Sequence, residues 1–444
     1  MEKKEIAVVG AGLVGSLISI FMAKRGHSVK VYERRSDMRK AGAIGGRSIN
    51  LALSDRGFRA LERVGIADEI RKLCIPIHGR MMHAESGELT SQPYGKEGQF
   101  INSVSRGALN KKLVEVAESF EKVEFLFDQK CVKYDTKSTE LLMQDQLASS
   151  NYTIKPDMII GADGAFSRVR YSLQKGPRFN YSQDYLPHGY KELRIPPGEN
   201  GSYLIEKHAL HIWPRTSFML MALPNLDGSF TCTLFAPFEG KDSFESIKTD
   251  EDVKAFFNLH FPDAVPLMPT LVEDWNENPT SSLVTVKCWP WSYKNVLLIG
   301  DASHAVVPFY GQGMNSGFED CTILDEFMDK YEDWDEMIDA YDNTRKVDAD
   351  AISVLAKRNF VEMRDKVADP LFLLRKKIAA HIGKLHPEFI PVYSMVTFSH
   401  LPYSQALAEM DRQDKVFEDI LSWDGIEEKW DSAYLSKIES LLLS

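Results

Sequence analysis

The chain has 444 residues, of which 44% are hydrophobic and 26% are charged. This balance is ordinary for a globular protein and excludes a wholly disordered chain, and the length corresponds to about three domains. The formal net charge is −11, from 53 lysines and arginines against 64 aspartates and glutamates. Nucleic-acid phosphates are bound by clustered cations, so an acidic chain without a basic block is not expected to bind nucleic acid.

The cysteines and one long apolar run bear on the cellular compartment. Five cysteines are scattered without a Cys-x-x-Cys pair, which predicts neither a disulfide framework nor a bound metal and is typical of a reducing compartment. Residues 6–23 are uncharged over 18 positions, which approaches the length of a membrane span. Three glycines inside this run and the charged segment after it favour a nucleotide-binding turn instead, so no transmembrane segment is predicted.

The first predicted elements form a strand–helix–strand unit. A buried strand is expected at residues 5–9, a helix at about 13–25 and a second strand at 28–32. Gly26 and His27 interrupt the apolar pattern between the helix and the second strand.

Gly10, Gly12 and Gly15 stand between the first strand and the helix at GxGxxG spacing. Gly10 permits a tight turn, Gly12 lets a pyrophosphate approach the backbone, and Gly15 lets the helix pack on the strand. Glu33 follows the second strand, 18 residues after Gly15, where a carboxylate can accept hydrogen bonds from a ribose. The unit predicts a dinucleotide site without distinguishing FAD from NAD.

The middle of the chain changes from helices to strands. Short helices are predicted within residues 55–73 and at 109–118, and the stretch 76–103 indicates strands and loops. From about 180 to 285, alternating apolar and polar residues predict a mostly antiparallel sheet. The remainder, beyond about residue 316, is predicted to be helical.

Two further buried strands, at 158–160 and 295–299, end in acidic turns. The first leads into Asp163 and a pair of arginines, a pattern that by itself fits a surface turn equally well. The second leads into Asp301, whose carboxylate needs a partner such as a ribityl hydroxyl. A glycine-rich turn at 311–313 leaves bare amides before the next helix, and such amides stabilise negative charge.

These three motifs, in this order and spacing, resemble those of the flavoprotein aromatic hydroxylases, the single-component FAD monooxygenases. The resemblance covers the chain from residue 6 to about 410, and the segments SINLALS, PHGYKEL and YSMVTFS make it more specific. It implies FAD as cofactor, NADPH and O2 as co-substrates, and oxygen transfer to an aromatic ring through a flavin C4a-hydroperoxide. The cofactor-binding residues that it implies are Gly10, Gly12, Gly15, Glu33, Arg34, Ala52, Arg106, Cys131, Asp163, Asp301, Gly313, Met314 and Asn315.

The fold class follows from the spread of the nucleotide-binding strands along the chain. We predict an α/β protein in which a Rossmann-like FAD-binding domain is interleaved with a mostly antiparallel β-sheet substrate domain and followed by C-terminal helices. The predicted regions are 1–75, 104–178 and 285–330 for the FAD-binding domain, 76–103 and 179–284 for the substrate domain, and 331–444 for the helices.

The resemblance also implies an aromatic amino acid as the small-molecule substrate. Arg80 and Tyr94 are then expected to hold its carboxylate, with Asn359 and Tyr403 completing the polar contacts. A bidentate cation with neutral hydrogen-bonding groups suits such a ligand. Without the resemblance, a surface arginine and core tyrosines would be the better interpretation. The residues expected to line the aromatic ring are Phe235, Phe309 and Met363.

Tyr310 departs from the family pattern, in which His or Phe stands at this position. Phe309 and Tyr310 are expected near the reaction site, but the sequence does not define the role of Tyr310. No side chain is predicted as a catalytic acid or base, because the flavin carries the chemistry.

The sequence also leaves alternative functions open and bears on the cellular location of the protein. The residues leave open a monooxygenase of another aromatic acid such as hydroxybenzoate or salicylate, a flavin-binding redox sensor without turnover, and an NAD-dependent dehydrogenase. Family members from eukaryotes carry a C-terminal membrane segment, whereas residues 411–444 lack about 20 consecutive apolar positions. We therefore expect a soluble, cytoplasmic protein of the bacterial type, and a homodimer is compatible with it.

Overall fold

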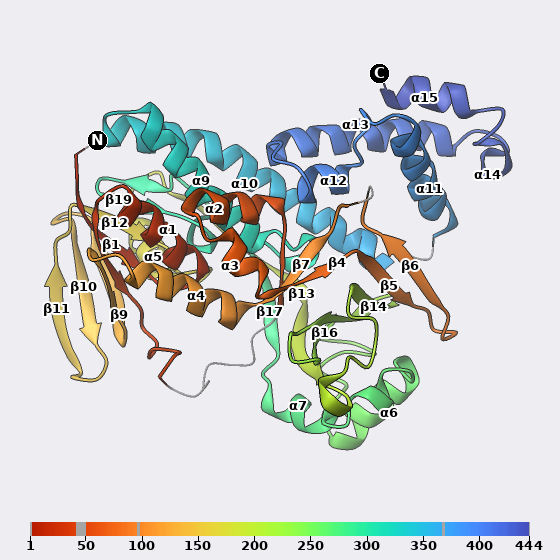
Figure 1. Ribbon diagram of the computed structural model, residues 1–444, viewed down its shortest axis with the longest axis horizontal. Helices are drawn as coiled ribbons and strands as arrows, with labels where there is room; N and C mark the ends of the chain where they lie inside the picture. Colours follow the sequence, from red (N-terminus) through yellow and green to blue (C-terminus); the bar gives the residue numbers. More distant parts are fainter. Residues whose placement is uncertain (1, 41–49, 96–97, 366–368, 444) are drawn as a thin grey trace.

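The structure is a computed structural model that describes residues 2–40, 50–95, 98–365 and 369–443, without the side chains of residues 363–365 (Figure 1). Its first layer is a six-stranded sheet in the order β18-β19-β12-β1-β2-β8, in which all pairs except β18–β19 are parallel. The strands are β1 (Glu5–Val9), β2 (Ser28–Tyr32), β8 (Val123–Leu126), β12 (Met158–Gly161), β18 (Ser292–Tyr293) and β19 (Val296–Leu298).

The central strands of this sheet are continuous apolar runs because helices cover them. β1, β12 and β19 are almost wholly buried, as is usual for parallel strands packed on both faces. The helix α1 (Leu13–Lys24) packs against both α4 (Arg106–Glu118) and α9 (Gly313–Lys330). The helix predicted to start at residue 109 begins three residues earlier, because the Ser105 hydroxyl caps it by accepting the Ala108 N–H.

A second, seven-stranded sheet has the order β17-β13-β16-β15-β14-β5-β6, and only its β14–β5 pair is parallel. One face is covered by α6 (Asp250–His260) and α7 (Leu271–Glu277). The opposite face packs against α10 (Trp334–Asp365) and the turn at 307–310. The strands are β5 (Gly79–His83), β6 (Leu89–Pro93), β13 (Asn180–Ile195), β14 (Ala209–Arg215), β15 (Phe218–Pro224), β16 (Phe230–Pro237) and β17 (Ser281–Trp289).

Two small antiparallel sheets flank these layers (Figure 1). One consists of β9 (Gln129–Asp135), β10 (Glu140–Asp145) and β11 (Ser150–Ile154), and lies at the outer edge of the six-stranded sheet. The other consists of β3 (Asn50–Leu53), β4 (Cys74–Ile77) and β7 (Ile101–Ser105).

The C-terminal part is helical and has a core of its own. Ile378, Phe417, Ile420 and Trp430 belong to this buried cluster, which is separate from the two sheets. Among the described residues, no helix combines the length and apolar character needed to cross a bilayer. The helices are α11 (Pro370–Leu385), α12 (Val392–Thr397), α13 (Tyr403–Leu421), α14 (Ile426–Lys429) and α15 (Leu435–Leu443).

The predicted fold class is confirmed, as a mixed α/β architecture with several sheets and C-terminal helices. The strands of the six-stranded sheet all fall within the three segments assigned to the FAD-binding domain, and most strands of the seven-stranded sheet fall within 76–103 and 179–284. β17 crosses the expected boundary at 284/285, so the domain limits themselves stay a prediction.

Candidate functional site

The glycine-rich turn joins three segments of the six-stranded sheet. Gly10 has φ +102°, and its N–H donates to the Tyr32 carbonyl at 2.8 Å. A Cβ at Gly10 would lie 2.6 Å from the Ala162 carbonyl oxygen, so the end of β12 requires glycine there. Gly12 precedes α1, whose first-turn amides receive no capping side chain. Such amides and the positive end of the helix dipole form an anion site.

Glu33 is held beside this turn by two backbone amides. One carboxylate oxygen accepts the Ala11 N–H and the other accepts the Arg35 N–H, each at 2.9 Å. A carboxylate has about four lone-pair sites, so capacity for ribose hydroxyls remains. Arg34, next to it, is exposed.

The second motif brings Asp163 and Cys131 together. One Asp163 oxygen accepts the Arg168 N–H at 2.6 Å and the Val169 N–H at 3.3 Å, while the other is buried without a partner. Desolvation raises the pKa of Asp163, because the backbone and Ser167 hydrogen bonds offset burial only in part. Burial, with the nearby Asp163 charge, raises the pKa of Cys131 to about 12. The orphan oxygen fits a hydroxyl donor from a bound group.

Asp301 directly follows β19 and Gly300. Its side chain keeps exposed area, so the carboxylate is open to a ligand. Desolvation raises the pKa of Asp301, and the charges of Arg106 and His304 act in the opposite direction. Arg106, the exposed first residue of α4, is therefore close enough to the third motif for its charge to act on Asp301.

Asn315 connects the glycine-rich end of the third motif to β3. Its amide nitrogen donates to the carbonyls of Ala52 and Gly311, each at 2.8 Å, and its amide oxygen accepts the Ser54 N–H at 3.0 Å. The amide is therefore occupied by protein, and this residue sets the position of its neighbours. Gly313 and Met314 begin α9 half-buried and without a capping side chain, which leaves their N–H groups for an anionic edge.

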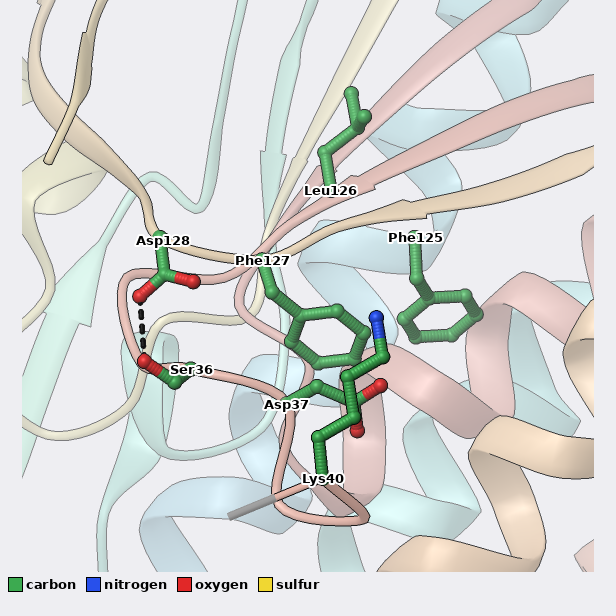
Figure 2. A pocket seen from close by; sticks show the side chains of 7 residues that line it. All are labelled: Ser36, Asp37, Lys40, Phe125, Leu126, Phe127 and Asp128. Atoms are coloured by element: carbon green, nitrogen blue, oxygen red, sulfur yellow. Dashed lines mark hydrogen bonds between the residues drawn. The ribbon is translucent and has the colours of Figure 1, made fainter. Parts of the chain in front are cut away.

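The hollow at residues 36–40 and 125–128 lies beside the end of β2 (Figure 2). Ser36 donates to the Asp128 carboxylate at 2.6 Å there, and Asp37 is paired with Arg39 at 2.8 Å. Two carboxylates close to one lysine, Lys40, do not suit a phosphate. This hollow is not a candidate for the site.

The substrate end of the candidate site is built around Arg80, on β5. Its guanidinium lies 4.8 Å from the ring centre of Tyr393 and 5.3 Å from that of Tyr94. The two rings stack with centres 5.6 Å apart, and Tyr310 stacks on Tyr393 at the same distance. The Arg80 Nε is buried without a hydrogen-bond partner, and no carboxylate of the described residues pairs with the guanidinium.

The charges here are the Arg80 cation and, near it, an ion pair between Lys376 and Glu362 at 3.5 Å. Burial disfavours charged Arg80, but the Tyr393 and Tyr94 hydroxyls outweigh it and raise the pKa of Arg80. Burial raises the pKa of Tyr94 and of Tyr310 well above the ordinary range, so both stay protonated near neutrality. A half-buried cation whose Nε is buried, with no paired carboxylate among the described residues, favours an anionic ligand.

An aromatic wall adjoins this cation. Phe309 stacks on Phe360 with ring centres 4.3 Å apart and lies 5.1 Å from Phe235. Asn359 donates its amide to the Phe309 carbonyl at 2.7 Å, so it fixes the wall. The side chain of Met363, also predicted to line the ring, lies outside the described side chains.

Tyr403, expected to complete the polar contacts with Arg80, has other partners in the structure. Tyr403 is 0% exposed, and its hydroxyl donates to the Gln312 side chain at 2.9 Å, under the guanidinium of Arg56 at 4.0 Å. Tyr393, ten residues earlier, takes the place beside Arg80. Sequence reasoning missed Tyr393 and Phe360, although Tyr393 lies in the specific segment YSMVTFS.

Comparison with known proteins agrees with this geometry. A family model for an FAD binding domain matches residues 3–354, which defines the chain as a flavoprotein. Kynurenine 3-monooxygenase of Christiangramia forsetii is 49% identical over 446 residues, covering 100% of this chain and 99% of the relative. That of Sus scrofa is 44% identical over 432 residues, covering 96% and 90%. The chain belongs to the kynurenine 3-monooxygenase family of FAD-dependent monooxygenases, and its cofactor is FAD.

Solved structures share the fold at low sequence identity. The tetrameric form of 2-methyl-3-hydroxypyridine-5-carboxylic acid oxygenase has a TM-score of 0.67 at 20% identity, covering 83% of this chain and 95% of that one. A probable FAD-dependent monooxygenase from Pseudomonas aeruginosa has a TM-score of 0.65 at 18% identity, covering 82% and 97%. The likeness extends to architecture, and it does not bear on the substrate.

Gly12→Ala should leave the fold intact while weakening FAD binding. No heavy atom lies within 4 Å of an ideal Cβ at Gly12, whose φ is −73°, so the methyl group fills only the space expected for the pyrophosphate. We expect FAD affinity to fall by about tenfold or more, with apoprotein stability within about 0.5 kcal/mol. Flavin absorbance of the purified variant and denaturant unfolding of the apoprotein measure the two effects.

Two further glycine variants serve as controls for Gly12→Ala, one expected to be disruptive and one expected to be neutral. Gly15→Ala would place a Cβ 1.9 Å from the Gly10 carbonyl oxygen, and should lose about 2–3 kcal/mol of stability together with FAD. Gly383→Ala, on α11 with only ordinary contacts, should retain both. Full FAD binding by Gly12→Ala would contradict the placement of the pyrophosphate.

Proposed function

We propose that this protein hydroxylates L-kynurenine to 3-hydroxy-L-kynurenine, with NADPH and O2 as co-substrates. The observation that carries the proposal is Arg80, a cation with a buried, unpartnered Nε and no paired carboxylate among the described residues. The substrate's α-carboxylate would supply the missing anion, and its aryl ring would extend toward Phe309. The similarity to kynurenine 3-monooxygenases supports this substrate.

The carboxylate end is proposed to use Arg80, Tyr94 and Tyr393. A guanidinium binds a carboxylate bidentately, and two protonated hydroxyls donate further hydrogen bonds without adding charge. The Tyr94 and Tyr393 rings stack with an interplanar angle of 6°, which holds both hydroxyls in a fixed arrangement. Asn359 and Tyr403 would then act through the residues that they position.

The aryl end is proposed to lie against the aromatic wall of Phe235, Phe309 and Phe360. These rings are buried or pack against the same buried cluster, so they exclude water and orient the substrate ring. Tyr310 stays protonated and offers a neutral hydroxyl at this end. The aniline nitrogen of the substrate donates electron density to the ortho carbon that is hydroxylated.

The cofactor is proposed to lie along the three motifs. The α1 amides and Glu33 would hold the pyrophosphate and ribose, with Asp163 and Asp301 toward the ribityl chain and the amides of Gly313 and Met314 at the flavin edge. When bound, FAD supplies the redox chemistry, accepting two electrons from NADPH and delivering them to O2. The remaining residues proposed in this set are Arg34, Ala52, Arg106, Cys131 and Asn315. A homodimer would not alter the assignment, because every proposed contact lies within one chain.

Anaerobic mixing of the FAD-loaded protein with NADPH tests the substrate. We expect L-kynurenine to accelerate flavin reduction by about tenfold or more, because its carboxylate and ring fill both ends of the pocket. Salicylate and 4-hydroxybenzoate should give less than about twofold, because each has a carboxylate without the matching length. Stronger acceleration by either phenolic acid would redirect the proposal to that acid. If none of the three compounds accelerated flavin reduction by NADPH, the proposal would be contradicted.

Arg80→Met should weaken L-kynurenine binding while FAD content stays normal. Removing the cation takes away a charge-assisted, enclosed contact, so we expect about a 100-fold rise in Kd. Perturbation of the flavin spectrum by added L-kynurenine measures this Kd. Arg194→Met, a surface position on the same sheet paired with Asp227 at 3.5 Å, is the matched control and should bind as the unmodified protein does. Unchanged affinity in Arg80→Met would rule out the carboxylate contact.

A further inference from the structure

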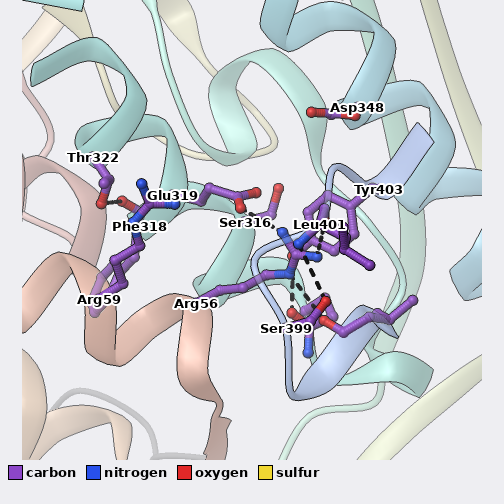
Figure 3. Close-up of polar contacts among 12 residues, drawn as sticks. Arg56, Arg59, Ser316, Phe318, Glu319, Thr322, Asp348, Ser399, Leu401 and Tyr403 are labelled. Atoms are coloured by element: carbon purple, nitrogen blue, oxygen red, sulfur yellow. Dashed lines mark hydrogen bonds and ion pairs between the residues drawn. The ribbon is translucent and has the colours of Figure 1, made fainter. Parts of the chain in front are cut away.

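Arg56, on α2 (Asp55–Val64), is only 1% exposed and bonds to the segment around α12 (Figure 3). Its Nε donates to the Val396 carbonyl at 3.0 Å, and one terminal nitrogen donates to the carbonyls of Met395, at 3.3 Å, and Leu401. Two of these carbonyls belong to the last turn of α12, where helix carbonyls lack partners within the helix. Arg56 thereby fixes the short helix that carries Tyr393.

The same guanidinium also bonds to α9, the helix that begins at the third motif. Its other terminal nitrogen bonds to Glu319 on α9 at 2.5 Å, and Glu319 also pairs with Arg345 at 2.9 Å. The adjacent Asp320 accepts the Arg345 Nε–H at 2.8 Å and the Gly300 backbone N–H at 2.8 Å. A buried chain of alternating charges therefore runs from α12 to the turn that presents the third motif.

Asp320 is held ionised in this chain. Burial alone would raise its pKa, but His304, at 2.6 Å, and Arg345 outweigh burial and hold the pKa of Asp320 below its ordinary value. Arg56 and Arg345 therefore face three carboxylates, those of Glu319, Asp320 and Asp348, the last at 3.6 Å from Arg345. Such paired buried charges are rigid, since displacing one leaves another unpaired.

A second contact connects Arg56 to the flavin loop, the glycine-rich turn at residues 311–313. The guanidinium lies 4.0 Å from the ring centre of Tyr403, whose hydroxyl donates to Gln312 at 2.9 Å. Gln312 immediately precedes Gly313, the first residue of α9. Tyr403 therefore connects Arg56 to the amides at the start of α9.

We propose that Arg56 is a positioning residue that couples occupancy of the substrate pocket, sensed at Tyr393, to the geometry of the flavin loop, and so sets how strongly substrate accelerates flavin reduction. The inference rests on the proposed function, because it takes L-kynurenine as the ligand that contacts Tyr393. A ligand carboxylate that accepts a hydrogen bond from Tyr393 shifts the start of α12. The last turn of α12 is bonded to Arg56, so the shift reaches that side chain. Packed cores respond to such shifts by changing between discrete arrangements.

Arginine is required by the directions of these partners. Its planar fork places separate N–H groups on the α12 carbonyls and on Glu319, which lie on different sides. Lysine keeps the charge but concentrates three donors on one nitrogen, so Arg56→Lys cannot make both sets of bonds. This variant therefore keeps the positive charge at position 56 and breaks the connection.

The test compares flavin reduction by NADPH, without oxygen, in the presence and absence of saturating L-kynurenine. In the FAD-loaded Arg56→Lys protein the ratio of the two rate constants should fall about tenfold, with the rate without substrate and the FAD content little changed. Arg59→Lys is the matched control. Arg59 also joins α2 to α9, through Glu326 at 2.5 Å, but at the surface, so its ratio should stay within about twofold of the original.

The outcomes separate the coupling from the substrate assignment. If L-kynurenine accelerates reduction of the original protein and the ratio of rate constants is unchanged in Arg56→Lys, the coupling is overturned and the proposed function stands. Absence of acceleration in the original protein overturns the proposed function and the coupling with it. If Arg56→Lys does not retain FAD, Tyr403→Phe decides, because it removes only the hydroxyl bond to Gln312. Its ratio should then fall about threefold or more, and an unchanged ratio overturns the coupling.

Discussion

A guanidinium without a protein counter-ion is the constraint on which the candidate site depends. Arg56 and Arg345 are more deeply buried than Arg80, at 1% and 0% exposure, and each is paired with a carboxylate. Arg80 has instead the faces of Tyr94 and Tyr393 and a buried Nε without a partner. The two tyrosines keep Arg80 charged but carry no charge of their own, so this position favours an anion that comes from outside the chain.

The two sheets and the C-terminal helices each contribute one side of this arrangement. β5, the strand next to the edge strand β6 of the seven-stranded sheet, carries Arg80, and α12 carries Tyr393, whose ring lies against its guanidinium. The turn at Phe309 and Tyr310 follows the last strand of the six-stranded sheet and joins the same buried cluster. The candidate site therefore lies where segments far apart in sequence meet, as expected when an FAD domain and a substrate domain are interleaved. Charge pairing within Arg56, Glu319, Arg345 and Asp320 makes that meeting point rigid.

Much of the fold was predictable because its signals are local. The glycine spacing, the acid after the second strand and the apolar runs that end in Asp163 and Asp301 each depend on neighbours in sequence. The tyrosines were harder, because Tyr393 and Tyr403 each stand in the first two residues of a helix that follows a proline. Only tertiary packing decides which of them faces Arg80. Similarly, the amides of Asn315 and Asn359 bond to backbone carbonyls of distant segments, Ala52 and Phe309, and no local pattern encodes these partners.

The central claim is that Arg80 binds the α-carboxylate of the substrate. Changing that carboxylate, rather than the protein, tests the claim most directly. The measurement is the Kd of the FAD-loaded protein for L-kynurenine and for L-kynurenine amide, in which a neutral carboxamide replaces the α-carboxylate. We expect the amide to bind about 100-fold more weakly, and the difference to shrink to about threefold or less when Arg80 is replaced by methionine. Equal affinity of the unmodified protein for the two ligands would contradict the account.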